Sequence, residues 1–264
     1  LRTPSISSTV RQFRALNVGP GPAIQLRARK PRDHPFRTVT NSRLKLKQGE
    51  TMTTSDRDSM TILAIGAHPD DIEYGCAGSL IKYRQQGHRI FLLVVTNGAC
   101  KGDPEVRKTE QMEAARIMGA EDVFFGDYPD TELTCSRELI MFIENIARKV
   151  QPDFGFVPYP EDTHQDHRTL AQAAIPASRS IIKNVLYYDG LSTQNFTPSI
   201  FVDIESVLGT KMAYLEAHKS QVMNTYIQDM SIVDVARASA HFRGIQGRVK
   251  HAEAFSPVRV FINI

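Results

Sequence analysis

From residue 60 onward, short β-branched or aromatic runs alternate with segments of helical length, and this alternation constrains the fold more than any other feature. The strand-like runs cover 62–66, 90–96, 123–125, 154–158, 185–188 and 200–204. The helical segments cover 76–86, 105–118, 136–149, 168–182 and 206–219, followed by a predicted helix over 230–240 and a strand over 258–262. Such alternation predicts right-handed βαβ units, and hence an α/β, Rossmann-like fold with a mostly parallel sheet and helices on both faces.

The first 59 residues differ from the rest of the chain. They are rich in Ser, Thr, Arg and Pro and show no sustained helical or strand period, which predicts a disordered basic leader. Residues 60–264 are then predicted to form a single domain. No Met precedes Met52, and two interpretations stay open: synthesis that begins at Met52 or Met60, or an organelle transit peptide, which is typically Arg-rich, Ser-rich and poor in acidic residues.

The charge of the chain is divided between these two parts. Residues 1–51 hold eleven Lys and Arg against Asp33 and Glu50, a net charge of +9. Residues 52–264 hold 21 basic and 27 acidic residues, a net charge of −6. Because the predicted domain is acidic, we expect no nucleic-acid partner.

Hydropathy and cysteine content limit where such a chain can work. No apolar run approaches the roughly 20 residues needed to span a bilayer, so we expect no membrane segment. The three cysteines, Cys76, Cys100 and Cys135, have neither disulfide-type nor metal-type spacing. This sparse, odd set is typical of a reducing compartment, and we expect a cytoplasmic protein.

Polar residues cluster directly after the first predicted strand, in the segment Ala-His-Pro-Asp-Asp at 67–71. Ligands of doubly wound folds collect at the carboxyl ends of the strands. The loop lacks the Gly-x-Gly-x-x-Gly pattern, so it is not the usual dinucleotide cradle. Imidazole and carboxylate are good zinc ligands, so His68, Asp70 and Asp71 predict a metal site. The alternative is that one of the two acids only caps the following helix.

A second polar cluster follows the predicted strand over 154–158. It contains His164, Asp166 and His167, and the last of these opens the next predicted helix. The carboxyl ends of parallel strands meet at one edge of a sheet, so we expect both clusters to lie close together.

Taken together, the clusters supply a catalytic type of ligand set. One histidine added to His68 and Asp71 gives two nitrogens and one carboxylate, with a coordination position left open, as in catalytic zinc sites. Non-haem iron oxygenases use the same ligand types. Those enzymes usually have all-β barrels, so the alternation of strands and helices favours zinc.

The two clusters closely resemble those of the zinc deacetylases of the PIG-L/LmbE family, whose members remove N-acetyl groups from glucosamine-containing molecules. The motifs that match at full length are AHPDD (67–71) and HQDH (164–167). The likeness extends over 60–264 through NGA (97–99), PEVRKTEQMEAARIMGA (104–120), GDYPDTEL (126–133), HKSQ (218–221) and FRGIQGRVKHAEAF (242–255).

This resemblance implies a role for each residue of the two motifs. Zn²⁺ would be held by His68, Asp71 and His167. Asp70 would be the general base that takes a proton from the attacking water. His164 would stabilise or protonate the reacting amide.

The resemblance also suggests roles outside the metal set. Asp166 would orient an imidazole, as residues around metal ligands commonly do. Arg107 would reach the substrate. The alternative for Arg107 is a solvated helix face on which it pairs with Glu110 at i,i+3, and both interpretations stay open. His218 and Arg243 lie in matching motifs without an assigned role.

The function implied is that of a zinc-dependent hydrolase that removes the N-acetyl group from a small, sugar-like substrate of the N-acetylglucosamine type. Relatives form hexamers or other homo-oligomers, so we expect a homo-oligomer. Two alternatives stay open: a metal-dependent hydratase or lyase on the same fold, and a non-catalytic sugar-binding protein. The intact AHPDD motif favours hydrolysis over both.

Overall fold

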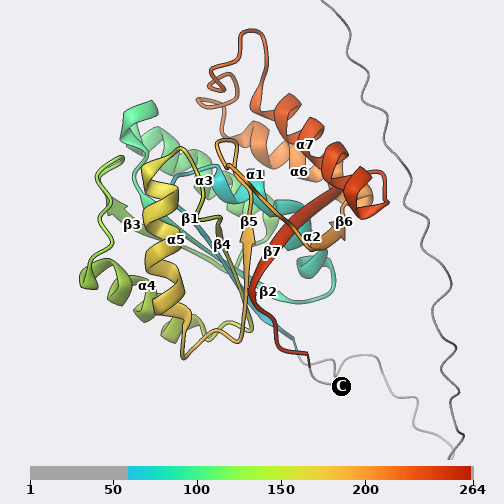
Figure 1. The fold of residues 1–264 in the computed structure, drawn as a ribbon. Coiled ribbons are helices and arrows are strands. Elements are labelled where there is room, and N and C mark those ends of the chain that lie inside the picture. Colours follow the sequence, from blue (N-terminus) through green and yellow to red (C-terminus); the bar gives the residue numbers. More distant parts are fainter. Residues whose placement is uncertain (1–58, 263–264) are drawn as a thin grey trace, which may run out of the picture. The chain divides into compact units, whose positions relative to one another are not determined.

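Residues 59–262 are described by the computed structural model, and seven strands form its sheet (Figure 1). The strands are β1 (Thr61–Gly66), β2 (Arg89–Thr96), β3 (Asp122–Tyr128), β4 (Phe154–Pro158), β5 (Asn184–Tyr188), β6 (Ile200–Asp203) and β7 (Ala252–Arg259). Their order across the sheet is β3-β2-β1-β4-β5-β7-β6. Neighbouring strands from β3 to β5 are parallel, whereas β7 is antiparallel to both β5 and β6.

The strand order reverses at β1, which pairs with β2 on one side and with β4 on the other. In open α/β sheets the ligand crevice forms at such a reversal, outside the carboxyl ends of the strands. The segments that follow β1 and β4 carry the two polar clusters found in the sequence. The fold therefore brings them to one place.

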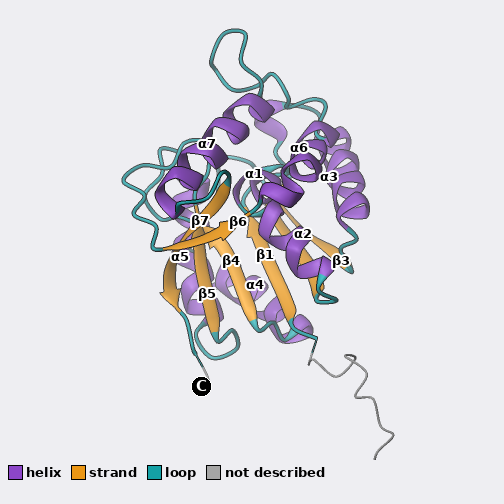
Figure 2. Ribbon diagram, turned by 90° about the vertical axis from the view of Figure 1, so that its right-hand side faces the viewer, coloured by secondary structure: helices purple, strands orange, loops and turns teal. Residues whose placement is uncertain are grey.

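Helices cover both faces of the sheet, which confirms the predicted α/β class (Figure 2). They are α1 (Asp71–Gly75), α2 (Ala77–Gln85), α3 (Pro104–Met118), α4 (Arg137–Val150), α5 (Gln165–Ser178), α6 (Leu208–Ala217) and α7 (Ile232–Gly247). Along β1, Ile62 and Ala64 pack in a core with α2, α3, α6 and α7, whereas Leu63 and Ile65 pack in a second core with α4 and α5. This alternation follows from side chains pointing to opposite faces along a strand.

Several predicted boundaries were wrong, and the helix predicted over 230–240 spans Ile232–Gly247. The helix predicted over 168–182 begins at Gln165, because His164 caps it through a hydrogen bond from the Asp166 N–H. The last strand, predicted over 258–262, spans Ala252–Arg259 instead. The apolar residues over 258–262 have the composition of a buried strand, yet Phe261 and Ile262 are 64% and 74% exposed. The true strand begins with small residues and a buried acid, a pattern that hydropathy does not reveal.

That buried acid, Glu253, ties three elements together. Its carboxylate accepts the backbone N–H groups of Gly78 and Ser79 at the start of α2, each at 2.7 Å, where the helix dipole favours negative charge. Lys211 of α6 places Nζ 2.6 Å from Glu253 Oε1 and also donates to the carbonyl of Tyr74. The side chains of Lys211 and Glu253 are only 4% and 3% exposed.

Replacing Lys211 with Met is expected to lower the free energy of unfolding by about 3–5 kcal/mol, because it leaves an unpaired carboxylate in the core. Urea-induced unfolding measures this change. The matched control is Lys149→Met, since Lys149 is 66% exposed and lies 4.0 Å from Asp122. An exposed pair of this kind contributes at most about 1 kcal/mol. A loss for Lys211→Met as small as that of the control would contradict the stabilising role of the buried pair.

None of the helices within residues 59–262 combines the length and the apolar composition needed to cross a bilayer. All of the predicted leader over 1–59 except Ser59 lies outside the described residues, so its disorder stays a prediction.

Candidate metal centre

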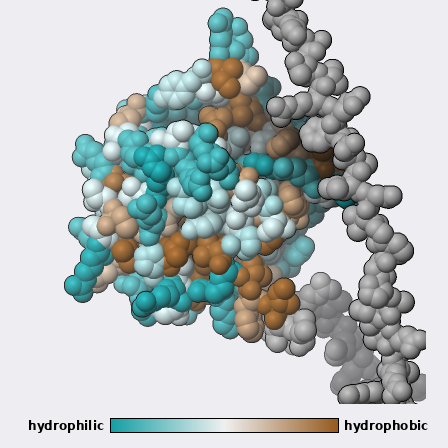
Figure 3. All heavy atoms as spheres, viewed as in Figure 1, coloured by the Kyte–Doolittle hydropathy of each residue, from teal (hydrophilic) through white to brown (hydrophobic). Residues whose placement is uncertain are grey.

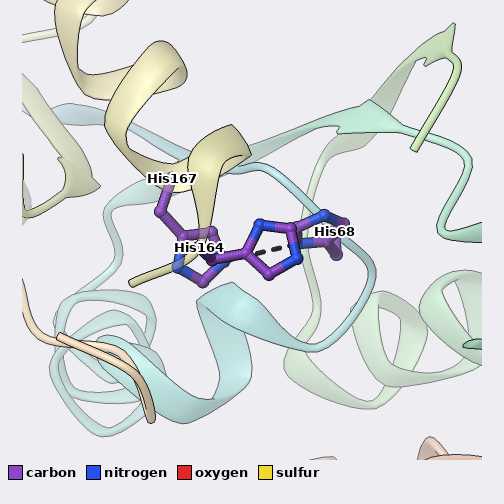
Figure 4. A group of neighbouring side chains, drawn as sticks. All are labelled: His68, His164 and His167. Atoms are coloured by element: carbon purple, nitrogen blue, oxygen red, sulfur yellow. Dashed lines mark hydrogen bonds between the residues drawn. The ribbon is translucent and has the colours of Figure 1, made fainter. Parts of the chain in front are cut away.

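Three imidazoles converge where the loops after β1 and β4 meet (Figure 4). His68 comes from the loop after β1, whereas His164 and His167 come from the start of α5. His68 and His167 are buried, and His164 is half-buried. One ring nitrogen of each lies within 4.8 Å of the others, which places three potential metal ligands around one point.

Asp71 lies next to two of these imidazoles, those of His68 and His167. His167 Nε2 lies 3.3 Å from His68 Nδ1 and 3.3 Å from Asp71 Oδ1, and His68 Nδ1 lies 3.5 Å from Asp71 Oδ2. Ligands at about 2.0–2.2 Å from a tetrahedral Zn²⁺ are separated from one another by about 3.3–3.6 Å. The three measured separations, which involve both carboxylate oxygens of Asp71, are close to that range.

Carboxylates face the other ring nitrogens of the two buried imidazoles. His68 Nε2 lies 3.1 Å from Asp130 Oδ1 and 3.2 Å from Asp166 Oδ2, and His167 Nδ1 lies 3.1 Å from Asp162 Oδ2. Such partners fix the ring orientation, so that His68 Nδ1 and His167 Nε2 point to the centre. The structure thus places Asp166 against an imidazole, the position predicted for it.

Sequence reasoning missed Asp130 and Asp162 in this arrangement. Asp130 follows β3 and Asp162 follows β4, so both lie at the carboxyl edge where polar residues were expected to gather. Their position after a strand was the only hint in the sequence. It does not distinguish the acids that face an imidazole from the other acids at this edge.

The carboxylates make the centre favourable for positive charge. Burial alone would lower the pKa of His68, but Asp130, Asp166 and Asp71 hold it well above its usual value. Burial would likewise lower the pKa of His167, yet Asp71 and Asp162 raise it to about 9. Without a metal, the surroundings thus favour protonated imidazoles. A divalent cation at the centre would likewise offset the negative charge of the surrounding carboxylates.

Asp70 lies beside this centre in a strained backbone conformation, with φ 100° and ψ −21°. Its N–H donates to Gln111 Oε1 at 3.3 Å, and its Oδ2 lies 3.4 Å from Arg107 Nη2. Burial raises the pKa of Asp70 to about 6, with Asp71 adding to the rise and Arg107 opposing it. At neutral pH the side chain is therefore mostly ionised, with a pKa suited to proton transfer.

Arg107 is buried, so the solvated-face alternative for this residue was wrong. Its Nη1 donates to the carbonyl of Gly98 at 2.8 Å and its Nη2 to that of Pro69 at 2.7 Å. Glu110, the partner expected in that alternative, accepts hydrogen bonds from Ser220 instead. Gly98 has φ +66°, and a Cβ there would lie 2.4 Å from Arg107 Nη1. Arg107 therefore holds the loop after β1 while it lines the cavity described below.

His164 is arranged as a neutral hydrogen-bond donor. Its Nδ1 accepts the N–H of Asp166, so in the neutral ring the proton resides on Nε2. Burial, together with the charges of His68 and His167, lowers the pKa of His164 below its usual value. The ring centroid lies 4.5 Å from that of His68 and 4.9 Å from that of His167.

His218, which had no assigned role, lies buried behind Asp70. Its Nε2 is 3.5 Å from Glu73 Oε2, and Glu73 Oε1 accepts a hydrogen bond from Gln111 Nε2 at 2.8 Å. Gln111 in turn receives the N–H of Asp70. His218, Glu73 and Gln111 thus form a buried chain of polar contacts that ends at the strained backbone of Asp70.

The centre lies in the wall of a cavity of about 560 Å³. Sites for drug-sized ligands commonly measure about 300–1,000 Å³. Asp70, His164 and Arg107 line the same cavity as the three potential metal ligands His68, Asp71 and His167. A bound molecule can thus contact these potential metal ligands, the Asp70 carboxylate and the His164 imidazole at once.

Residues 63–178 match the PIG-L family, which is described as GlcNAc-PI de-N-acetylase. The chain is 34% identical over 168 residues to the uncharacterized deacetylase YaiS of Escherichia coli strain K12, which covers 60% of this chain and 90% of that relative. It is 29% identical over 189 residues to the diacetylchitobiose deacetylase of Thermococcus kodakarensis, covering 62% and 71% of the two chains. The crystal structure of a conserved protein from Thermus thermophilus superposes with a TM-score of 0.69 at 28% identity, over 77% of this chain and 97% of that one.

Proposed function

The chain belongs to the PIG-L family, and from that premise we propose that it is a zinc-dependent hydrolase that removes the N-acetyl group from a small, N-acetylglucosamine-type sugar. Deacetylases among its relatives support the removal of acetyl groups. The observation that carries the proposal for metal and mechanism is the set of 3.3–3.5 Å contacts among His68, Asp71 and His167, with Asp70 beside them.

His68, Asp71 and His167 would hold the metal ion. A bound Zn²⁺ would make water more acidic and would polarise the acetyl carbonyl. Asp71 is prepared for this role, because the N–H groups of Ala67 and His68 donate to its Oδ2, each at 2.9 Å. Although burial would raise the pKa of Asp71, His167 and His68 hold it well below its usual value, so it stays ionised.

Asp70 is the proposed general base. Its carboxylate takes a proton from the water that attacks the acetyl carbon. The same proton can return to the sugar nitrogen as the C–N bond breaks, so that water and amide yield acetic acid and amine, and the acid then loses its proton to become acetate. The contacts to Gln111 and Arg107 hold Asp70 in place for both steps.

His164 is proposed to stabilise the negative charge that develops on the amide oxygen. Because its Nδ1 is occupied by the Asp166 N–H, Nε2 is the nitrogen that can donate. A donor that is already positioned stabilises such charge without reorganisation during the reaction. A neutral imidazole suffices for this role.

Acetate release tests the proposal. The full chain, loaded with Zn²⁺, is incubated with N-acetylglucosamine, diacetylchitobiose and aryl N-acetylglucosaminides, and acetate and free amine are measured separately. We expect equal amounts of both from at least one of these sugars. An unsaturated dicarboxylic acid is assayed in parallel, and addition of water to it without acetate from any sugar would favour the hydratase alternative. Sugar binding without any acetate would favour the non-catalytic alternative and would overturn the proposal.

A further inference from the structure

The loop between α6 and α7, residues 218–231, projects beyond the neighbouring helices at the top of Figures 1 and 2. Part of it lines the same cavity as His68 and Asp70. Its lining residues are Gln221, Asn224, Thr225, Tyr226 and Ile227. The cavity therefore extends from the candidate metal centre to this loop.

The side chains that the loop leaves free at the cavity are apolar. Tyr226 is 80% exposed and Ile227 is 48% exposed, and Leu191, from the loop after β5, also lines the cavity and is exposed. Figure 3 shows apolar atoms gathered just below the tip of this projecting loop. Exposed apolar side chains at the mouth of a cavity commonly mark a binding surface.

The side chains of Gln221 and Thr225 are already hydrogen-bonded, within the loop or to the segment after β2. Gln221 Nε2 donates to the carbonyl of Lys101, and Gln221 Oε1 accepts from Asn224 Nδ2. Thr225 Oγ1 donates to the carbonyl of Met230 at 2.7 Å and accepts the N–H of Ile227. The amide of Gln221 and the hydroxyl of Thr225 are thus already occupied in the protein without a ligand.

Tyr226 is held in its exposed position. Its backbone has φ +59°, in the left-handed region that non-glycine residues rarely adopt. The ammonium of Lys101 lies 4.0 Å from the ring centroid, a cation–π contact that fixes the ring against the segment after β2. The rest of the ring faces solvent and the cavity.

We propose that Tyr226, Ile227 and Leu191 form a subsite for an apolar aglycone, that is, an aryl or alkyl group attached to the amino sugar. This inference rests on the proposed function, which places the sugar at the metal centre. The cavity joins the two places, so one molecule can reach both. A second sugar ring would need several free donors and acceptors, whereas Gln221 and Thr225 of this loop are already hydrogen-bonded.

Calorimetric titration with reaction products tests this subsite without requiring turnover. The ligands are glucosamine and the two anomers of 4-nitrophenyl 2-amino-2-deoxyglucoside. We expect at least one anomer to bind the Zn²⁺-loaded protein about fivefold to tenfold more tightly than glucosamine does. In Tyr226→Asn that ratio should fall to about one. Asn tolerates the left-handed backbone, so this substitution removes the ring without adding strain.

Met223→Ala is the matched control, because Met223 lies in the same loop and is 62% exposed but does not line the cavity. This variant should keep the ratio of the unchanged protein. Three outcomes would each overturn the subsite. The protein could bind glucosamine and both aryl glycosides with equal affinity, or it could bind neither aryl anomer. The third outcome is a preference for the aryl glycoside that persists in Tyr226→Asn. Acetate release is scored separately, so an aryl preference without acetate would defeat the proposed function and leave the subsite standing.

Discussion

Replacing Asp70 with Asn is expected to lower kcat by a factor of about 10²–10⁴ while the bound metal stays at the level of the unchanged protein. The reason is that Asn keeps the size of the side chain but cannot accept a proton from water. The hydrogen bond to Gln111 comes from the backbone N–H of Asp70 and is unaffected. Acetate release and metal content, measured on the same sample, separate lost proton transfer from lost metal.

Asp127→Asn is the control for this substitution. Asp127 also has a positive φ, of 52°, but its side chain is 61% exposed and pairs with Lys108 at the surface. We expect its kcat to remain within about twofold of the unchanged protein, since exposed pairs contribute little. Near-normal kcat in Asp70→Asn would rule out the general-base assignment.

Replacing His167 with Ala is expected to remove both metal and activity. This change deletes one of three ligands, and it leaves Asp71 and Asp162 without the imidazole that separates them. Removing the partner of buried charges is costly in itself. After extensive dialysis, bound zinc should fall from about one ion per chain to near zero, as measured by atomic emission.

His164→Ala provides the contrast, because His164 is proposed to act on the substrate and not on the metal. Its zinc content should match that of the unchanged protein, whereas kcat should fall by about 10²–10³, the loss typical of one oxyanion donor. Full zinc occupancy in His167→Ala would contradict the proposed ligand set. Metal loss in His164→Ala would place that imidazole on the metal.

Hydropathy alone predicted most of the sheet, because buried parallel strands are nearly continuous apolar runs. The runs at β1, β2 and β4 are of this kind. The insertion of β7 between β5 and β6 could not be predicted. β7 contains the charged residue Glu253, whose buried side chain finds its partners in α2 and Lys211, far along the chain.

The site was predictable to the extent that its residues are close in sequence. His68, Asp70 and Asp71 lie within four consecutive residues, and so do His164 and His167, so two motifs pointed to one centre. The burial of Arg107 was not predictable. It depends on carbonyl groups of two loops that only the folded sheet brings to α3.

Acetate release before and after metal removal tests the central claim most directly. The full chain is treated with a chelator, dialysed and assayed with the sugar that gave the highest rate, and Zn²⁺ is then added back in steps. We predict that the metal-free protein releases acetate no faster than the buffer does, and that activity returns in proportion to bound zinc up to about one ion per chain. Undiminished acetate release by the metal-free protein would contradict the account.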